Sequence, residues 1–267
     1  MGGLLIPTWA VRFDFATKLV DDEAACKRVA EILVRPCFHE LERLSIHRGD
    51  RWIEHGPKSA DRIVSILRDA RNKAATLDTR KGREIVANAE IRNGTREAPA
   101  EPTRYDSELM FPVDASAVEA TVAAVCELAA TLDVGAGFVA VEPAYDDAHR
   151  AAIGLSLPRA RTGVSQRRRI ERRGRDWHDI DRPTLLAGPE WGTFLGAQHL
   201  AKLDLETVRR SGAFARVVEI TPARLAFLQV TENPEDDLRE DFEAKLIEAR
   251  KVLAPIAMDL SDVNLDG

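Results

Sequence analysis

The sequence has few cysteines, few aromatic side chains and no long apolar run. Its 267 residues include 3 cysteines, which form no C-x-x-C pair, and an odd number of thiols gives no closed disulfide framework. We therefore expect reduced thiols and a cytoplasmic protein. No run of about 18 apolar residues occurs, so no membrane-spanning helix is predicted. Residues 1–15 also lack the basic start and apolar stretch of a secretory signal.

Catalytic and nucleotide-binding signatures are missing as well. The six histidines form neither H-E-x-x-H nor a zinc-type spacing with cysteine. The sequence contains no G-x-S-x-G nucleophile elbow and no glycine-rich phosphate loop. From these absences we predict no enzyme activity, no cofactor and no metal site.

One enzymatic alternative stays open in the stretch D-W-H-D-I-D, residues 176–181. Asp176, His178, Asp179 and Asp181 are the residue types of an acid–base pair or a metal site. Such a stretch is more typical of a polar loop, in which aspartates form side-chain turns. An enzyme with a dispersed site here is therefore the third function that we consider.

Charge of one sign is concentrated in a single segment. Residues Arg159–Arg175 hold eight arginines and one acid, and contribute +7 to a net charge of −6, so the rest of the chain carries −13. Nucleic-acid-binding domains are usually basic over a whole face. We interpret the segment as an exposed loop that contacts an acidic patch of a partner, with Arg167, Arg168, Arg169 and Trp177 as candidate contacts. Binding of nucleic acid through phosphate contacts from this segment is the second function that we consider.

An acidic run, Glu232–Glu243, follows near the end of the chain. A run of this kind is usually the solvated start of a helix, where acids are favoured by the helix dipole. It is also suited to bind a basic partner. The candidate partner-binding residues are Glu235, Asp236, Asp237, Glu240 and Asp241.

Periodicity predicts an α+β fold with a mixed, largely antiparallel sheet and packed amphipathic helices. A helix should follow a cap at Asp21 or Asp22 and end before Pro36, and Gly135 and Gly137 should end another helix. We expect one domain over residues 1–258, undivided or formed of lobes 1–106 and 107–258, with a loose acidic tail at 259–267. Predicted strands are 8–15, 83–92, 107–113, 137–143, 215–221 and 224–231, and predicted helices are 59–74, 116–132, 189–203 and 239–254.

Burial of the helical apolar faces is the test of this assignment. Each large apolar side chain left in water forgoes about 1.5–3 kcal/mol. Ile66, Val125, Phe194 and Leu246 should therefore be buried. Trp191, beside Phe194, is expected in the same buried face rather than at a recognition surface.

The second half of the sequence resembles a known family in the order of its motifs. The stretch G-P-E-W-G-T-F-L-G (188–196) resembles the W-x-T-F-L-G helix of the bacterial type VI immunity family, which is followed by a second short helix, two strands and a final helix with L-x-P. L-E-T-V-R-R-S-G, A-R-V-V-E-I-T, R-L-A-F-L-Q-V-T and A-R-K-V-L-A-P-I occur here in that order. Upstream, G-F-V-A-V-E-P and R-R-G-R-D-W-H-D-I are similar to two further family stretches. The resemblance covers about residues 107–257.

This resemblance implies a protein without catalytic activity that binds a cognate secreted antibacterial toxin and blocks its active site. The sequence departs from the family pattern at L-D-L-E (203–206) and T-E-N-P-E-D-D-L (231–238), so a partner of its own is expected. An acidic chain suits a basic toxin, such as a nuclease, because opposite charges speed the encounter.

Overall fold

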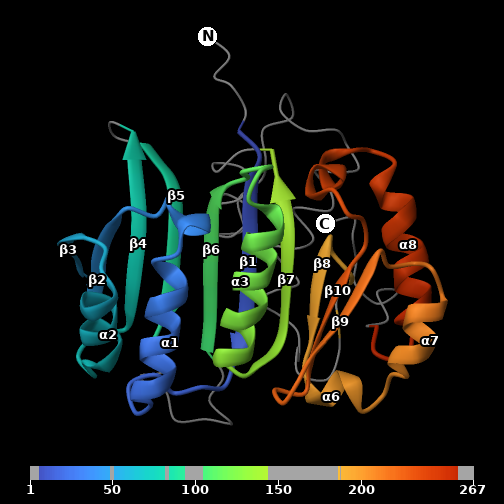
Figure 1. Cartoon of the computed structure of the whole chain (residues 1–267), viewed down its shortest axis with the longest axis horizontal. Helices are drawn as coiled ribbons and strands as arrows, with labels where there is room; N and C mark the ends of the chain where they lie inside the picture. Colours follow the sequence, from blue (N-terminus) through green and yellow to red (C-terminus); the bar gives the residue numbers. More distant parts are fainter. Residues whose placement is uncertain are drawn as a thin grey trace, which may run out of the picture.

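The computed structural model describes residues 6–48, 51–81, 84–93, 105–143, 186 and 188–257. The described strands form one ten-stranded sheet, and every pair of neighbouring strands is antiparallel (Figure 1). The predicted α+β class with a largely antiparallel sheet is confirmed. From one edge to the other, the sheet runs β3 (Arg51–Pro57), β2 (Arg43–Arg48), β4 (Ala74–Lys81), β5 (Glu84–Arg92), β6 (Tyr105–Pro112), β1 (Thr8–Phe15), β7 (Val134–Glu142), β8 (Gly192–Leu195), β10 (Leu225–Gln229) and β9 (Arg216–Ile220).

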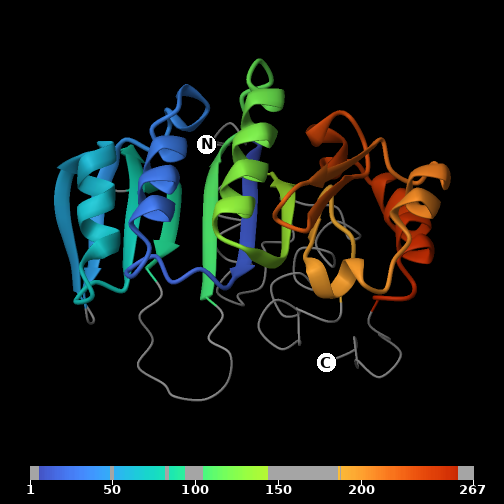
Figure 2. The ribbon, with the colours of Figure 1, turned by 60° about the horizontal axis from the view of Figure 1, so that its bottom comes forward.

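Three helices cover one face of the first seven strands in this order (Figures 1 and 2). They are α1 (Glu23–Leu33), α2 (Ala60–Arg68) and α3 (Val118–Thr131). Asp22 caps α1, as predicted, and Ser59 caps α2; each side chain accepts a hydrogen bond from a backbone N–H group of the first turn. Around the other end of the sheet lie α6 (Ala197–Leu200), α7 (Leu205–Arg210) and α8 (Phe242–Val252), with the short 3₁₀ helix η2 (Pro234–Leu238). A second 3₁₀ helix, η1 (Pro36–Phe38), follows α1 and contacts α3.

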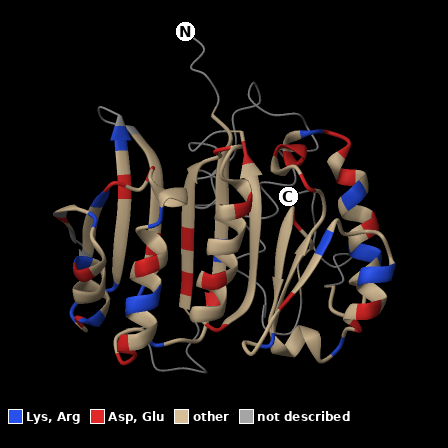
Figure 3. Cartoon of the chain, viewed as in Figure 1, with Lys and Arg blue, Asp and Glu red and all other residues tan. Residues whose placement is uncertain are grey.

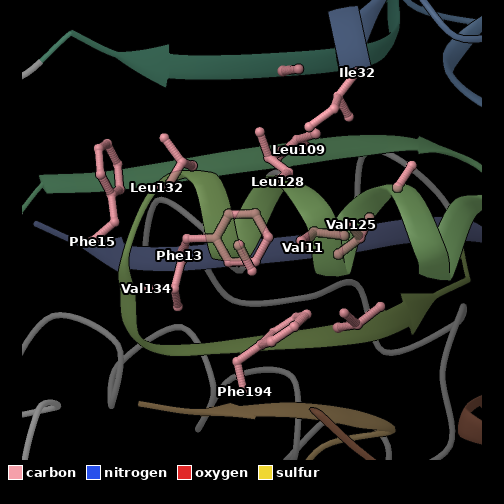
Figure 4. Packing of buried hydrophobic residues seen from close by; sticks show 14 of the residues in the cluster. Val11, Phe13, Phe15, Ile32, Leu109, Val125, Leu128, Leu132, Val134 and Phe194 are labelled. Carbon is pink, nitrogen blue, oxygen red and sulfur yellow. The ribbon is translucent and has the colours of Figure 1, made fainter. Parts of the chain in front are cut away.

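The core lies between this sheet and its helices (Figure 4). β1 runs through its centre, and Val11 and Phe13 point toward Val125 and Leu128 of α3. The four test residues, Ile66, Val125, Phe194 and Leu246, are at most 4% exposed, so their predicted burial is confirmed. Within the described residues, no helix is long and apolar enough to cross a membrane.

The predicted helix 189–203 is wrong. Residues Gly192–Leu195 form β8, and only Ala197–Leu200 are helical. All four residues of β8 are buried because β8 lies between β7 and β10 and is covered on both faces. Such a strand shows no apolar–polar alternation, so its sequence looks the same as that of a buried helix.

Other boundaries differ near the turns. The predicted helix 59–74 ends at Arg68, since Ala74–Lys81 is strand β4, and α8 begins at Phe242 rather than residue 239. α3 ends at Thr131, and the turn is made by Asp133, whose φ is +52°. The prediction that Gly135 and Gly137 end this helix is therefore wrong, because both glycines lie inside β7.

Candidate functional site

The acidic run predicted as a docking face lies where η2 leads into α8 (Figure 3). The side chain of Asn233 starts η2 by accepting a 3.0 Å hydrogen bond from the Glu235 amide. Glu235, Glu240 and Asp241 are exposed, and Asp236 is half-buried. These four carboxylates share one surface that a partner can reach.

Asp237 departs from the expected exposed cluster. Its side chain is 0% exposed, and its Oδ2 accepts a 2.7 Å hydrogen bond from the backbone N–H of Val141 in β7. The ladder between β7 and β8 ends at the pair Val139 and Gly192, so Val141 lies beyond the end of β8. The Asp237 carboxylate takes the place of the missing strand carbonyl, and its role is structural.

Arginine reduces the charge of the acidic surface. Both Nε and Nη2 of Arg239 donate 3.0 Å hydrogen bonds to the carboxylate of Asp241. These bonds hold the pKa of Asp241 below its usual value and raise the pKa of Arg239. A small depression of about 80 Å³ between these two residues is lined also by Asp236, Phe242 and Lys245. Glu235 and Glu240 are thus the exposed acids of the predicted cluster that lie outside this paired group.

The W-G-T-F-L-G stretch is a packing element. Trp191 is 0% exposed, as expected, stacks edge-on against Trp9 at a centroid distance of 5.4 Å, and donates its indole N–H to the Asn233 carbonyl at 3.2 Å. A Cβ on Gly196 would lie 2.5 Å from the Gly135 carbonyl oxygen, closer than real Cβ contacts. This stretch therefore joins β7, β8 and η2 in the interior.

Thiols and imidazoles offer no reactive pair in the described part of the chain. Burial raises the pKa of Cys26 to about 11 and that of Cys126 to about 12, so both thiols stay protonated at neutral pH. His199 is fully buried. Among the described residues, no group of three or more His, Cys, Asp or Glu side chains is placed to hold a metal ion.

Several candidate residues lie outside the described residues. These are the arginine segment with Arg167, Arg168 and Arg169, the neighbouring Trp177, and the D-W-H-D-I-D stretch. Their predicted roles stay predictions.

The sequence did not suggest a polar pocket on the sheet face opposite α1 and α2. It measures about 210 Å³ and is lined by Arg43 and Ser45 of β2, Glu54 of β3, and Asp78 and Arg80 of β4. The register brings these residues together, since Arg43 pairs with Asp78 and Ser45 pairs with Glu54. A correct strand assignment for residues 74–81 would have shown the alternation of apolar and polar side chains that aims Asp78 away from the core.

Comparison with known proteins gives one informative likeness. No family model matches the chain, and no curated protein matches its sequence. The fold is similar to that of the Pseudomonas aeruginosa T6SS protein PA0821, with a TM-score of 0.56 and 15% identity. The match covers 94% of this chain and 73% of that protein. The two chains therefore share a fold.

Proposed function

We propose that this protein is an immunity protein, which binds a cognate toxin of a type VI secretion system and blocks it without catalysis. The observation that carries the proposal is the fold likeness to a T6SS protein over 94% of the chain. The motif order that resembles the immunity family supports it, because those motifs correspond to β8, β9 and β10 of the sheet and to the helices α7 and α8.

Inhibition by binding requires a surface rather than a catalytic site. A specific complex buries about 800 Å² on each partner. The net charge of −6 attracts a basic toxin, such as a nuclease, and speeds its capture in the cytoplasm of the producing cell. Glu235 and Glu240 present such charge at the start of α8.

Co-expression with the product of the neighbouring reading frame tests the proposal, which requires that product to be a secreted effector. We expect growth of a susceptible host to be restored by this protein, and the two purified proteins to form a stoichiometric complex. Toxicity that persists beside the well-folded protein, with no complex in a titration calorimeter, would contradict the proposal.

Titration with random DNA and RNA at two salt concentrations tests the nucleic-acid alternative, which requires strong, salt-dependent binding.

Charge reversal at the acidic surface should slow capture of a basic toxin. For Glu235→Lys combined with Glu240→Lys, we expect an association rate about tenfold lower at low salt, with weaker salt dependence, because steering charges act on the encounter. Stopped-flow measurements at several ionic strengths give both quantities. The control is Glu23→Lys combined with Glu31→Lys on α1, which makes the same charge change on another exposed surface. Equal slowing by both pairs would show that only net charge matters.

The arginine segment provides the opposing test. If the acidic surface is the contact, then Arg167→Glu with Arg168→Glu and Arg169→Glu leaves the association rate unchanged or raises it. If the arginine segment is the contact, these reversals abolish protection and the acidic variants do not.

A further inference from the structure

The pocket between β2, β3 and β4 is built around a buried carboxylate. The β4 residues Ala75 and Leu77 belong to the core, so the alternate residues Thr76 and Asp78 face the opposite side of the sheet. The side chain of Asp78 is 8% exposed. A carboxylate removed from water to this degree needs donors close to both oxygens.

The described donors reach Asp78 only at long distances. Ser45 Oγ lies 3.4 Å from Oδ2, and Arg80 Nε lies 3.4 Å from Oδ1. Hydrogen bonds from a charged nitrogen to a carboxylate are normally about 2.7–2.9 Å long. Asp78 therefore retains unused capacity to accept a short hydrogen bond from a donor that enters the pocket.

The surrounding groups favour a positively charged donor. Arg43 forms a close ion pair with Glu54, which occupies its guanidinium. Within the pocket lining, the oxygens of Asp78 can accept from a donor, whereas an anion would lie beside the carboxylates of Asp78 and Glu54.

The size of the pocket suits a side chain. At roughly 30 Å³ for each water, a volume of about 210 Å³ holds about seven waters. This is more room than a single ion needs and enough for the end of a long side chain. Arginine is also enriched among the residues that dominate protein interfaces.

We infer that this pocket receives an arginine or lysine side chain of the bound toxin, whose cationic group hydrogen-bonds to Asp78. The inference rests on the proposed function and assigns to it a second contact, near the β3 edge of the sheet and apart from the acidic surface at η2 and α8 (Figure 1). The partner's cation supplies the short bond that Asp78 lacks, and the half-exposed Arg80 moves aside into solvent.

Asp78→Asn tests the contact, because the amide keeps the shape of the side chain and removes its charge. We expect the complex with the co-expressed effector to dissociate about 30-fold faster or more, the effect of removing one member of a buried charge pair. The matched control is Asp106→Asn on β6, a half-exposed carboxylate of the same sheet face that does not line the pocket. Equal dissociation rates for Asp78→Asn and the unmodified protein would overturn the inference and leave the proposed function standing.

Arg80→Ala separates cation binding from anion binding. Removal of this competing guanidinium should maintain or tighten the complex if the pocket holds a cation. A loss of affinity similar to that of Asp78→Asn would show that Arg80 binds an anion, and would overturn the inference.

A small-molecule titration tests the pocket without any toxin. We expect N-acetylarginine methylamide at millimolar concentration to shift the NMR amide signals of Ser45 and Asp78, and acetate to leave them unchanged. In Asp78→Asn the arginine response should disappear. Shifts with acetate alone, or no shift with either probe, would contradict the inference even if the protein proves to be an immunity protein.

Discussion

Replacing Gly196 with alanine is expected to lower the free energy of unfolding by about 2–3 kcal/mol, the cost of forcing extra volume into a packed interior. The added Cβ would lie 2.5 Å from the oxygen, 2.7 Å from the Cα and 2.9 Å from the carbonyl carbon of Gly135. All three are backbone atoms of β7, which cannot turn away as a side chain can. Either β7 or the link from β8 to α6 must shift.

Urea unfolding measures this loss as a lower midpoint at an unchanged slope. The control is Gly188→Ala, whose Cβ would meet, among the described residues, nothing closer than the end of the Arg250 side chain at 3.4 Å. We expect the control to change stability by less than about 0.5 kcal/mol. Equal midpoints for the two variants would show that Gly196 and Gly135 do not approach as closely as the structure places them.

Replacing Asp237 with alanine is expected to cost about 2–4 kcal/mol, among the larger effects of single substitutions. The change leaves the buried N–H of Val141 without its 2.7 Å acceptor, a loss worth about 1–3 kcal/mol by itself. It also removes the side chain that joins η2 to β7. Thermal and urea unfolding report the effect.

Glu235→Ala is the matched control, since Glu235 is two residues away, equally acidic and exposed. It should leave stability within about 0.5 kcal/mol. Asp237→Asn should fall between the two, because its amide oxygen can still accept from Val141. Wild-type stability of Asp237→Ala, together with a lost association rate, would instead place this carboxylate in the binding surface.

Helices and strands were predicted correctly where the spacing of apolar residues along the sequence matches the spacing of buried residues in the structure. In α2, Ile63, Ile66 and Leu67 are buried on one side, and the helix begins after a serine cap. β1 was also located, because apolar and polar residues alternate in W-A-V-R-F-D-F, and so was β7, which is a short apolar run after a turn. These signals are local, and tertiary contacts reinforce them.

The errors have physical causes as well. Helix 59–74 was extended too far because the alanines that follow Lys73 are strong helix formers, yet they begin β4. Asp237 looked like one more solvated acid, because its burial depends on where β8 stops along β7. The pocket around Asp78 depends on the pairing of β2 with β4, and no periodicity in the sequence specifies which strands become neighbours.

The central position of β1 has a consequence for how the chain folds during synthesis. Phe15 pairs with Tyr105 of β6 and with Val134 of β7, so β1 acquires its first neighbour only after about 90 further residues have been made. Loops of this length carry a large closure entropy, and folding rates fall as contacts become more distant in sequence. Until β6 emerges from the ribosome, β1 presents two unpaired edges with an apolar face, and one edge stays unpaired until β7 follows. Such surfaces are of the kind that chaperones protect.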